Sequence, residues 1–217
     1  MKSLALFLLS GAMVLAHTPA QAQRTPSEAA TAEQRLVEDI GTDRLPTTLL
    51  PAAGNDVRNT LTLLQSGAGN NATLDQRTPA TAAASQAYIT QVGTANALGL
   101  LQNGGGNSAY MAQEGNGNRA NLTQQGQGNS STITQKGTNN RLDELIIGDS
   151  NKMNVYQDGN NNKVNSEIRE DGRKYTISQQ GNGNTLTQLE TSSQVKGYGV
   201  EMRGNGINLI IEQSKVR

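Results

Sequence analysis

The sequence predicts an all-β fold, an amyloid-like β-solenoid of about seven strand-turn-strand coils with about 22 residues per coil. Three observations predict it. Glutamines recur every eleven residues over much of the chain, apolar and polar residues alternate before each glutamine, and a turn rich in Gly and Asn follows it. The pattern is compatible with a left- or right-handed solenoid.

The composition excludes several other classes of protein. The chain has no cysteine and no tryptophan, and its 18 basic and 18 acidic residues cancel. Disulfides and cysteine-based metal sites are therefore excluded, no cofactor is expected, and no nucleic-acid partner is required. With 34% hydrophobic residues a conventional core would be thin, so the chain is either disordered or buries amides against one another. The regular repeat favours buried amides.

Residues 1–22 are predicted to be a signal peptide. Lys2 precedes an apolar run over residues 4–16 that is too short to span a membrane, and Ala20, Gln21 and Ala22 form a small-x-small cleavage site. We expect cleavage after Ala22 and secretion. A short membrane anchor is the alternative, but no polar stop-transfer flank follows the run.

Residues 23–54 form an unrepeated leader. Ser27 as an N-cap and Gly41 as a C-terminal stop allow a short marginal helix near residues 28–40, and Pro46 and Pro51 then break regular structure. We expect this leader to be flexible or marginally helical.

The repeat region is predicted over residues 55–213, followed by a short tail over residues 214–217. Each unit is a seven-residue strand that ends at the glutamine place, and then a tight turn. Strands are expected to end at residues 65, 76, 91, 102, 113, 124, 135, 146, 157, 168, 179, 190, 202 and 213. Two insertions, in RTPATAAAS and in TSSQVKG, fall at turns, where they leave the inward face intact.

Sorting the strands alternately into two columns distinguishes a period of 22 residues from a period of eleven. The first column keeps its glutamines: Gln65, Gln91, Gln113, Gln135, Gln157 and Gln179. The second keeps its asparagines: Asn70, Asn96, Asn118, Asn140, Asn162 and Asn184. Ile146 and Ile168 replace glutamine on consecutive rungs of the second column, as expected if they touch. We therefore predict two parallel, in-register sheets that are not equivalent.

The physical reason for the spacing is that stacked amides satisfy each other. In-register strands about 4.8 Å apart place each Asn or Gln over an identical amide, so these columns are expected to form structural ladders. The turns are expected to need glycine, at Gly67, Gly93, Gly104, Gly115, Gly126, Gly137, Gly148, Gly159 and Gly181. Both ends of the stack would be open edges that can pair with another chain.

The pattern Q-x-G-x-x-N-x-A-x-x-x-Q occurs unmodified at residues 65–76, 102–113 and 113–124. It resembles the curlin repeat of curli fibre subunits. The resemblance implies a secreted functional amyloid subunit that stacks with itself or with related subunits into extracellular, cell-surface fibres for adhesion and biofilm. It also implies that residues 23–54 are recognised by an outer-membrane secretion pore.

The chain departs from that pattern toward its end. Charges become frequent from Arg141 onward, and Arg119, Arg141 and Lys163 fall on consecutive rungs of the outer face. These three are either gatekeepers, meaning charges that limit stacking, or a stripe for an anionic partner. Lys196, Met202 and Ile207 replace ladder amides in the last coil. A minor or nucleating subunit is therefore slightly favoured over a major one.

Other functions are weaker interpretations of the same repeat. A monomeric β-solenoid adhesin or scaffold is the main alternative. A calcium-binding solenoid would need an Asp in nearly every turn, and an ice-binding solenoid would need threonines on successive rungs; neither pattern persists. An enzyme is not expected, because the carboxylates are scattered and Glu144, at an inward place, has no paired carboxylate in its own coil.

Overall fold

The structure is a computed structural model that describes residues 59–191 and 196–214. The predicted signal peptide and leader, and residues 215–217 of the predicted tail, lie outside the described residues. So do residues 192–195, within the second predicted insertion.

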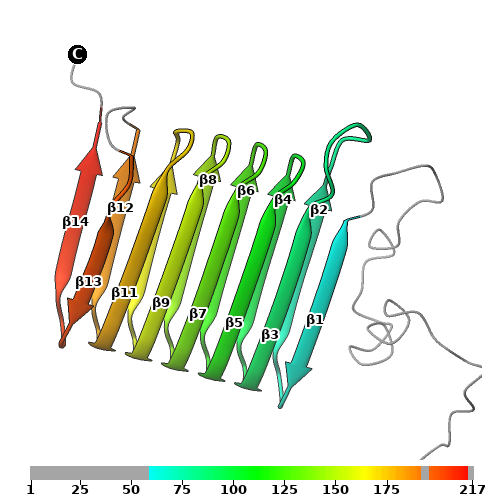
Figure 1. Cartoon of the computed structure of the whole chain (residues 1–217). Coiled ribbons are helices and arrows are strands. Elements are labelled where there is room, and N and C mark those ends of the chain that lie inside the picture. The colour runs from blue at the N-terminus through cyan, green and yellow to red at the C-terminus, as the bar shows by residue number, and fades with distance from the viewer. Residues whose placement is uncertain (1–58, 192–195, 215–217) are drawn as a thin grey trace, which may run out of the picture.

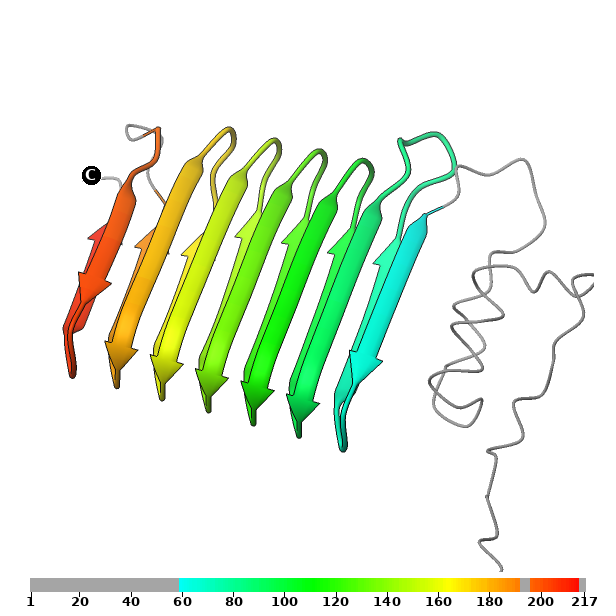
Figure 2. The same cartoon turned by 60° about the horizontal axis from the view of Figure 1, so that its bottom comes forward.

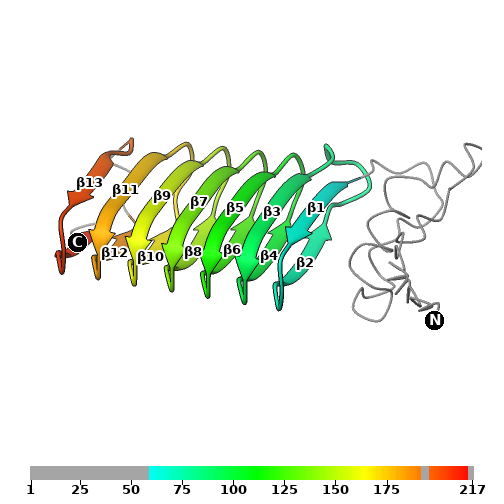
Figure 3. The same ribbon diagram turned by 90° about the horizontal axis from the view of Figure 1, so that it is seen from below.

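The described chain forms two parallel seven-stranded sheets, and successive strands alternate between them (Figure 1). The odd sheet contains β1 (Thr60–Ser66), β3 (Gln86–Thr94), β5 (Ser108–Asn116), β7 (Ser130–Thr138), β9 (Lys152–Asn160), β11 (Lys174–Asn182) and β13 (Gly199–Arg203). The even sheet contains β2 (Asn71–Arg77), β4 (Ala97–Asn103), β6 (Arg119–Gln125), β8 (Arg141–Ile147), β10 (Lys163–Ile168), β12 (Thr185–Glu190) and β14 (Asn208–Gln213). Figure 3 shows the two sheets as layers that face each other. One odd strand, the next even strand and their turns make one coil.

Neighbouring coils are stacked in register. Gln91 and Gln113 are Cα partners that lie 22 residues apart in the chain. The separation is 26 residues between Gln65 and Gln91 and 23 residues between Gln179 and Met202, so the extra residues leave the pairing unchanged. The predicted all-β solenoid, with two parallel sheets and about 22 residues per coil, is confirmed.

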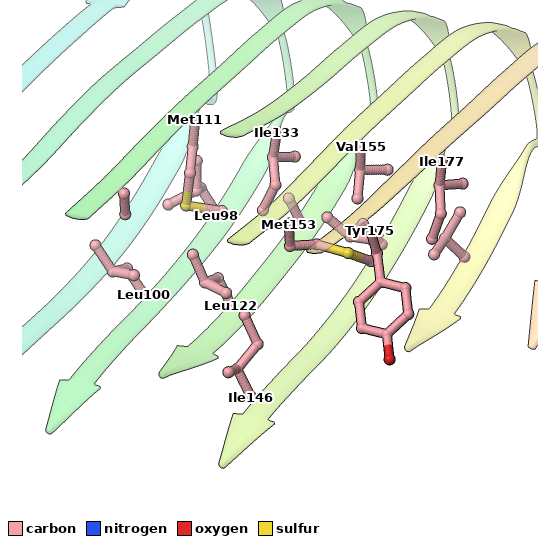
Figure 4. Close-up of a cluster of buried hydrophobic side chains, with 14 of the residues drawn as sticks. Leu98, Leu100, Met111, Leu122, Ile133, Ile146, Met153, Val155, Tyr175 and Ile177 are labelled. Atoms are coloured by element: carbon pink, nitrogen blue, oxygen red, sulfur yellow. The ribbon is translucent and has the colours of Figure 1, made fainter. Parts of the chain in front are cut away.

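The core lies between the two sheets because alternate residues of every strand point inward. One inward column of the odd sheet is apolar and buried in all seven strands: Leu63, Ile89, Met111, Ile133, Val155, Ile177 and Val200. Side chains of the even sheet, such as Leu100 and Leu122, face this column across the core (Figure 4). Ile146 and Ile168 are Cα partners, as their consecutive places predicted.

Two details of the fold differ from, or add to, the sequence prediction. Strands of seven residues were expected, whereas β3, β5, β7, β9 and β11 each have nine. They are longer because pairing continues through the glycine that was assigned to the turn, as between Gly93 and Gly115. The first insertion forms the larger loop between β2 and β3 in Figure 2. It packs onto the turn of the following coil, where the Gly106 N–H donates to the Ala83 carbonyl at 2.8 Å.

Candidate functional site: the amide ladders and the two ends of the stack

The glutamines of the odd sheet form a continuous ladder in which every amide has the same direction. The Nε2 of each glutamine donates to the Oε1 of the glutamine in the next coil. The distance is 2.7 Å from Gln91 to Gln113, 2.7 Å from Gln113 to Gln135, 2.8 Å from Gln135 to Gln157 and 2.9 Å from Gln157 to Gln179. Gln65 donates to Gln91 in the same way. The ladder therefore has an acceptor end at the first coil and a donor end at the last.

The same glutamines also connect the two sheets. Each Nε2 carries a second N–H, and in the odd sheet this group donates to a backbone carbonyl of the even sheet. Gln113 donates to the Ala97 oxygen at 3.1 Å, and Gln135 donates to the Arg119 oxygen at 2.9 Å. Gln91, Gln157 and Gln179 make the equivalent bonds. Both donors of each buried amide are therefore satisfied, which avoids a penalty of about 1–3 kcal/mol per unpaired group.

The asparagines of the second column use a different contact from the expected one. Asn96 Oδ1 accepts the backbone N–H of Asn118 at 3.0 Å, and Asn96 Nδ2 donates to the Gly115 carbonyl at 2.8 Å. This pair of bonds recurs at Asn70, Asn118, Asn140, Asn162 and Asn184. Two rungs add an amide-to-amide bond, such as Asn140 to Asn118 at 3.2 Å. Asparagine therefore links each coil mainly to the backbone of the coils beside it.

The turn glycines make this contact possible. All nine predicted positions have positive φ, a conformation that L-residues with side chains rarely adopt. A Cβ on Gly115 would lie 2.0 Å from the Gly137 carbonyl oxygen, and a Cβ on Gly93 would lie 2.1 Å from that of Gly115. The Q-x-G-x-x-N spacing thus places an acceptor carbonyl and an amide donor where consecutive coils meet.

A further set of stacked asparagines lies just before the odd strands, and it was not predicted from the sequence as a ladder. Asn129 donates its backbone N–H to Asn107 Oδ1, and Asn151 donates to Asn129 Oδ1, both at 3.0 Å. The same column contains Asn59, Ser85 and Arg173. The sequence feature that could have predicted it is the asparagine that precedes several of the odd strands. Ser85 and Arg173 interrupt the side-chain pattern but still supply the backbone N–H that the ladder needs.

The glutamine ladder of the even sheet ends in mid-stack. Gln76 donates to Gln102 at 2.7 Å and Gln102 to Gln124 at 2.8 Å, but the next rung is Ile146. Gln124 Nε2 instead donates to Ser131 Oγ at 3.1 Å, and Ser131 donates to Glu144 Oε1 at 2.9 Å. Burial raises the pKa of Glu144 to about 7, and the hydrogen bond from Ser131 opposes this rise. A buried carboxyl therefore terminates this ladder.

The basic residues singled out from the sequence form a stripe on the outer face of the even sheet. Arg119, Arg141 and Lys163 are exposed and are Cα partners on β6, β8 and β10. Asp143 forms an ion pair with Arg141 at 2.7 Å. Glu167, on the same sheet, forms an ion pair with Arg169.

The two ends of the stack differ in chemistry. At the first coil, Gln65 and Gln76 are only partly buried, and within the described residues their Oε1 atoms accept no hydrogen bond. At the last coil, the Nε2 of Gln179 meets the Met202 sulfur, at 3.6 Å, where the other glutamines meet an amide oxygen. Ile207 accepts no side-chain ladder bond, although its N–H donates to Asn184 Oδ1 at 3.0 Å. Ile210 of β14 is 68% exposed.

An aromatic contact lies in the core near the last coil. Tyr175 and Tyr198 pack edge to face with ring centroids 4.9 Å apart, and Tyr175 is buried in the core (Figure 4). Burial, followed by the charge of Glu190, raises the pKa of Tyr198 to about 12. The contact was not predicted from the sequence, although the two tyrosines occupy the same place in consecutive coils, since Thr176 pairs with Gly199.

No group of three or more His, Cys, Asp or Glu side chains is arranged to hold a metal ion within residues 59–191 and 196–214. Over the same residues, no helix has the length and apolar character needed to cross a membrane. Asp149 and Asp171 bind the backbone of the preceding turn, since their Oδ1 atoms accept the N–H of Gln127 and of Asp149 at 2.7 Å.

Fold and ladders together define a class, a parallel two-sheet β-solenoid whose coils are joined by buried amides. A family model, the curlin associated repeat, matches residues 93–126 and 118–143. Residues 93–143 therefore match the curlin repeat, as the sequence resemblance predicted, and this match and the fold together indicate a structural protein. The same contacts continue beyond the match, to Gln65 in one direction and Gln179 in the other. No curated protein matches the chain in a sequence search.

Proposed function

We propose that this protein is a secreted subunit of a curli-type amyloid fibre, in which coils of neighbouring molecules stack as coils do within one molecule. The observation that carries the proposal is the directional glutamine ladder, which stops at the first coil with the Oε1 of Gln65 facing no donor among the described residues. A further coil carrying a glutamine at that place would extend the ladder and pair the open backbone edges of β1 and β2.

The chemistry of the two ends favours a minor or nucleating subunit. In a head-to-tail stack of identical copies, Met202 of one molecule would lie against Gln65 of the next, and Ile207 would lie against Asn70. A thioether cannot donate to Gln65 Oε1, and isoleucine offers no Oδ1 to the Asn70 N–H. Only Gln213, opposite Gln76, would match. A related subunit with amides throughout its last coil is a better partner for the first coil than a second copy is.

The remaining parts of the proposal rest on family resemblance and on position in the chain. A signal peptide cleaved after Ala22 would direct the chain to export, and residues 23–54 would be recognised by an outer-membrane pore. Curlin repeats support self-assembly into extracellular fibres, and adhesion and biofilm matrix are the roles of such fibres in the family.

Seeded assembly tests the proposal. The secreted chain is followed with an amyloid dye, alone and as a trace seed for a related curlin-repeat subunit that keeps both glutamines in its last coil. We expect slow assembly alone and a shortened lag for the partner. The Met202→Gln, Ile207→Asn double variant restores the missing amides and should assemble alone faster, whereas Arg203→Gln, an exposed change in the same coil, should not.

A persistently monomeric chain that neither assembles nor seeds would contradict the proposal. That outcome would support the alternative, a monomeric β-solenoid adhesin or scaffold. Equal assembly of the parent chain and the double variant would contradict the nucleating role alone.

A further inference from the structure

Glu144 occupies a core place that is apolar in the preceding coils. Its column in the even sheet, in stacking order, is Leu74, Leu100, Leu122, Glu144, Ser166, Gln188 and Ile211. The Glu144 side chain points between the sheets, and the residue is 4% exposed. The three leucines show what this place accepts when only packing matters.

The contacts of Glu144 satisfy one of its two carboxyl oxygens. Oε1 accepts a hydrogen bond from the hydroxyl of Ser131, and that hydroxyl accepts one from Gln124 Nε2. Oε2 is buried and has no hydrogen-bond partner within the described residues. An ionised carboxylate there would carry a buried charge with an unpaired oxygen, which is strongly unfavourable.

Among the residues that the structure describes, no cation is placed to compensate such a charge. The buried inward-facing residues of the surrounding strands are Ala120, Leu122 and Gln124 of β6, Ser131, Ile133 and Gln135 of β7, Met153, Val155 and Gln157 of β9, and Val164, Ser166 and Ile168 of β10. Leu142 and Ile146 are the other inward residues of β8 itself. Within the described ranges, Glu144 is therefore the one titratable side chain that faces this part of the core.

We propose that Glu144 makes folding of the central coils depend on protonation. The coils fold with the carboxyl neutral, and they are destabilised when it ionises. In the unfolded chain this carboxyl is hydrated and ionises in the ordinary range for glutamate. In the folded coil, burial is the main cause that raises the pKa of this carboxyl, to about 7.

The sign of the pH dependence follows from this difference. The folded state holds the proton more tightly, so the unfolding constant is lowest below the ordinary glutamate pKa. It rises as the pH increases toward the folded pKa and is constant above it. Glu190, the other carboxylate buried in the described chain, contributes its charge to the neighbourhood of Tyr175 and Tyr198. The test must therefore separate the two by substitution.

Unfolding by a chaotrope, followed by circular dichroism from pH 4.5 to 8.5, tests the proposal on the full chain below its assembly concentration. The unfolding constant of the parent chain should rise on the order of 100-fold over this range, with most of the rise below about pH 7. Glu144→Leu, which continues the leucine column, should remove most of the rise, and Glu144→Gln should do the same. Asp143→Asn, the matched change at the next residue on the outer face, should retain it.

A Glu144→Leu chain that keeps the full pH dependence would overturn the proposal, as would a parent chain whose stability is constant with pH. If neither Glu144 variant folds, infrared spectroscopy of the folded parent chain decides. The carbonyl band of a protonated carboxylic acid should be present at pH 6 and lost as the pH passes 7. Its absence at pH 6 would overturn the proposal.

Discussion

Gln113 and Gln135 are buried in adjacent coils, and the Nε2 of Gln113 donates to the Oε1 of Gln135 at 2.7 Å. This bond joins two side chains 22 residues apart in the chain, while the second N–H of Gln113 bonds to the opposite sheet. Each glutamine thus fixes the register along the stack and the distance between the sheets. A ladder of such residues is therefore sensitive to a single break.

The first prediction concerns that sensitivity. Gln113→Leu leaves Gln91 Nε2 without its acceptor and Gln135 Oε1 without its donor, and should destabilise by about 2–5 kcal/mol. Gln135→Leu likewise leaves Gln113 Nε2 without its acceptor and Gln157 Oε1 without its donor. The double variant leaves only Gln91 Nε2 and Gln157 Oε1 unpaired, so its loss of stability should be clearly smaller than the sum of the two single losses. A double-mutant cycle on the free energy of unfolding measures this coupling; strict additivity would disprove the ladder as a coupled unit. Ile146 above Ile168 is a native example of an adjacent pair of replacements.

The second prediction concerns the turns. Gly115→Ala places a Cβ 2.0 Å from the Gly137 carbonyl oxygen, so coils on either side must separate, with a loss above about 3 kcal/mol. Gly183→Ala is the matched control, since Gly183 also has positive φ but its Cβ would meet nothing within 4 Å. It should lose only about 1–2 kcal/mol, from backbone strain. Thermal unfolding of both variants gives the comparison, and equal losses would show that strain alone accounts for the glycine.

The third prediction concerns the insertion between β2 and β3. A Cβ on Gly105 would lie 2.4 Å from the Ala82 Cβ, so Gly105→Ala should push the insertion off the turn beneath it. Faster amide exchange at Gly106, whose N–H donates to Ala83, would report the change. Adding Ala82→Gly removes the closest contact and should restore part of the protection. No change in exchange in the single variant would contradict the packing described for this loop.

The fourth prediction concerns the basic stripe. Arg119, Arg141 and Lys163 are exposed, and replacing all three with threonine should change the free energy of unfolding by less than about 1 kcal/mol. Assembly should respond more strongly. If the charges limit stacking or lateral contact, the variant should assemble faster at low salt and lose the acceleration that added salt gives the parent chain. Identical salt dependence of the two chains would exclude a gatekeeper role.

The repeat sufficed to predict the architecture because strand period, turn chemistry and insertion sites all indicated the same coil. The hydrogen bonds were harder to predict. Asn96 was expected to stack on like amides, but its shorter bonds are to the backbone, with Gly115 and Asn118. A one-dimensional pattern identifies which side chains stack and does not specify which atoms meet.

Features that break the repeat were the least predictable. Ser131 and Glu144 belong to different columns, so no periodicity connects them, and their bond is set by the distance across the core. Tyr175 and Tyr198, by contrast, occupy the same place in consecutive coils, because Thr176 pairs with Gly199, so the register brings them together even though neither tyrosine repeats along the column. Irregular residues interact through three-dimensional proximity, which the spacing of identical residues does not encode.

Fibre diffraction from aligned assemblies of the purified chain tests most directly the central claim, that molecules stack as their own coils do. The account predicts a meridional reflection near 4.8 Å, from strands perpendicular to the fibre axis, and an equatorial reflection near 10 Å, from the spacing of the two sheets. Ordered assemblies without the 4.8 Å meridional reflection, or no assemblies under any condition that leaves the chain folded, would contradict it.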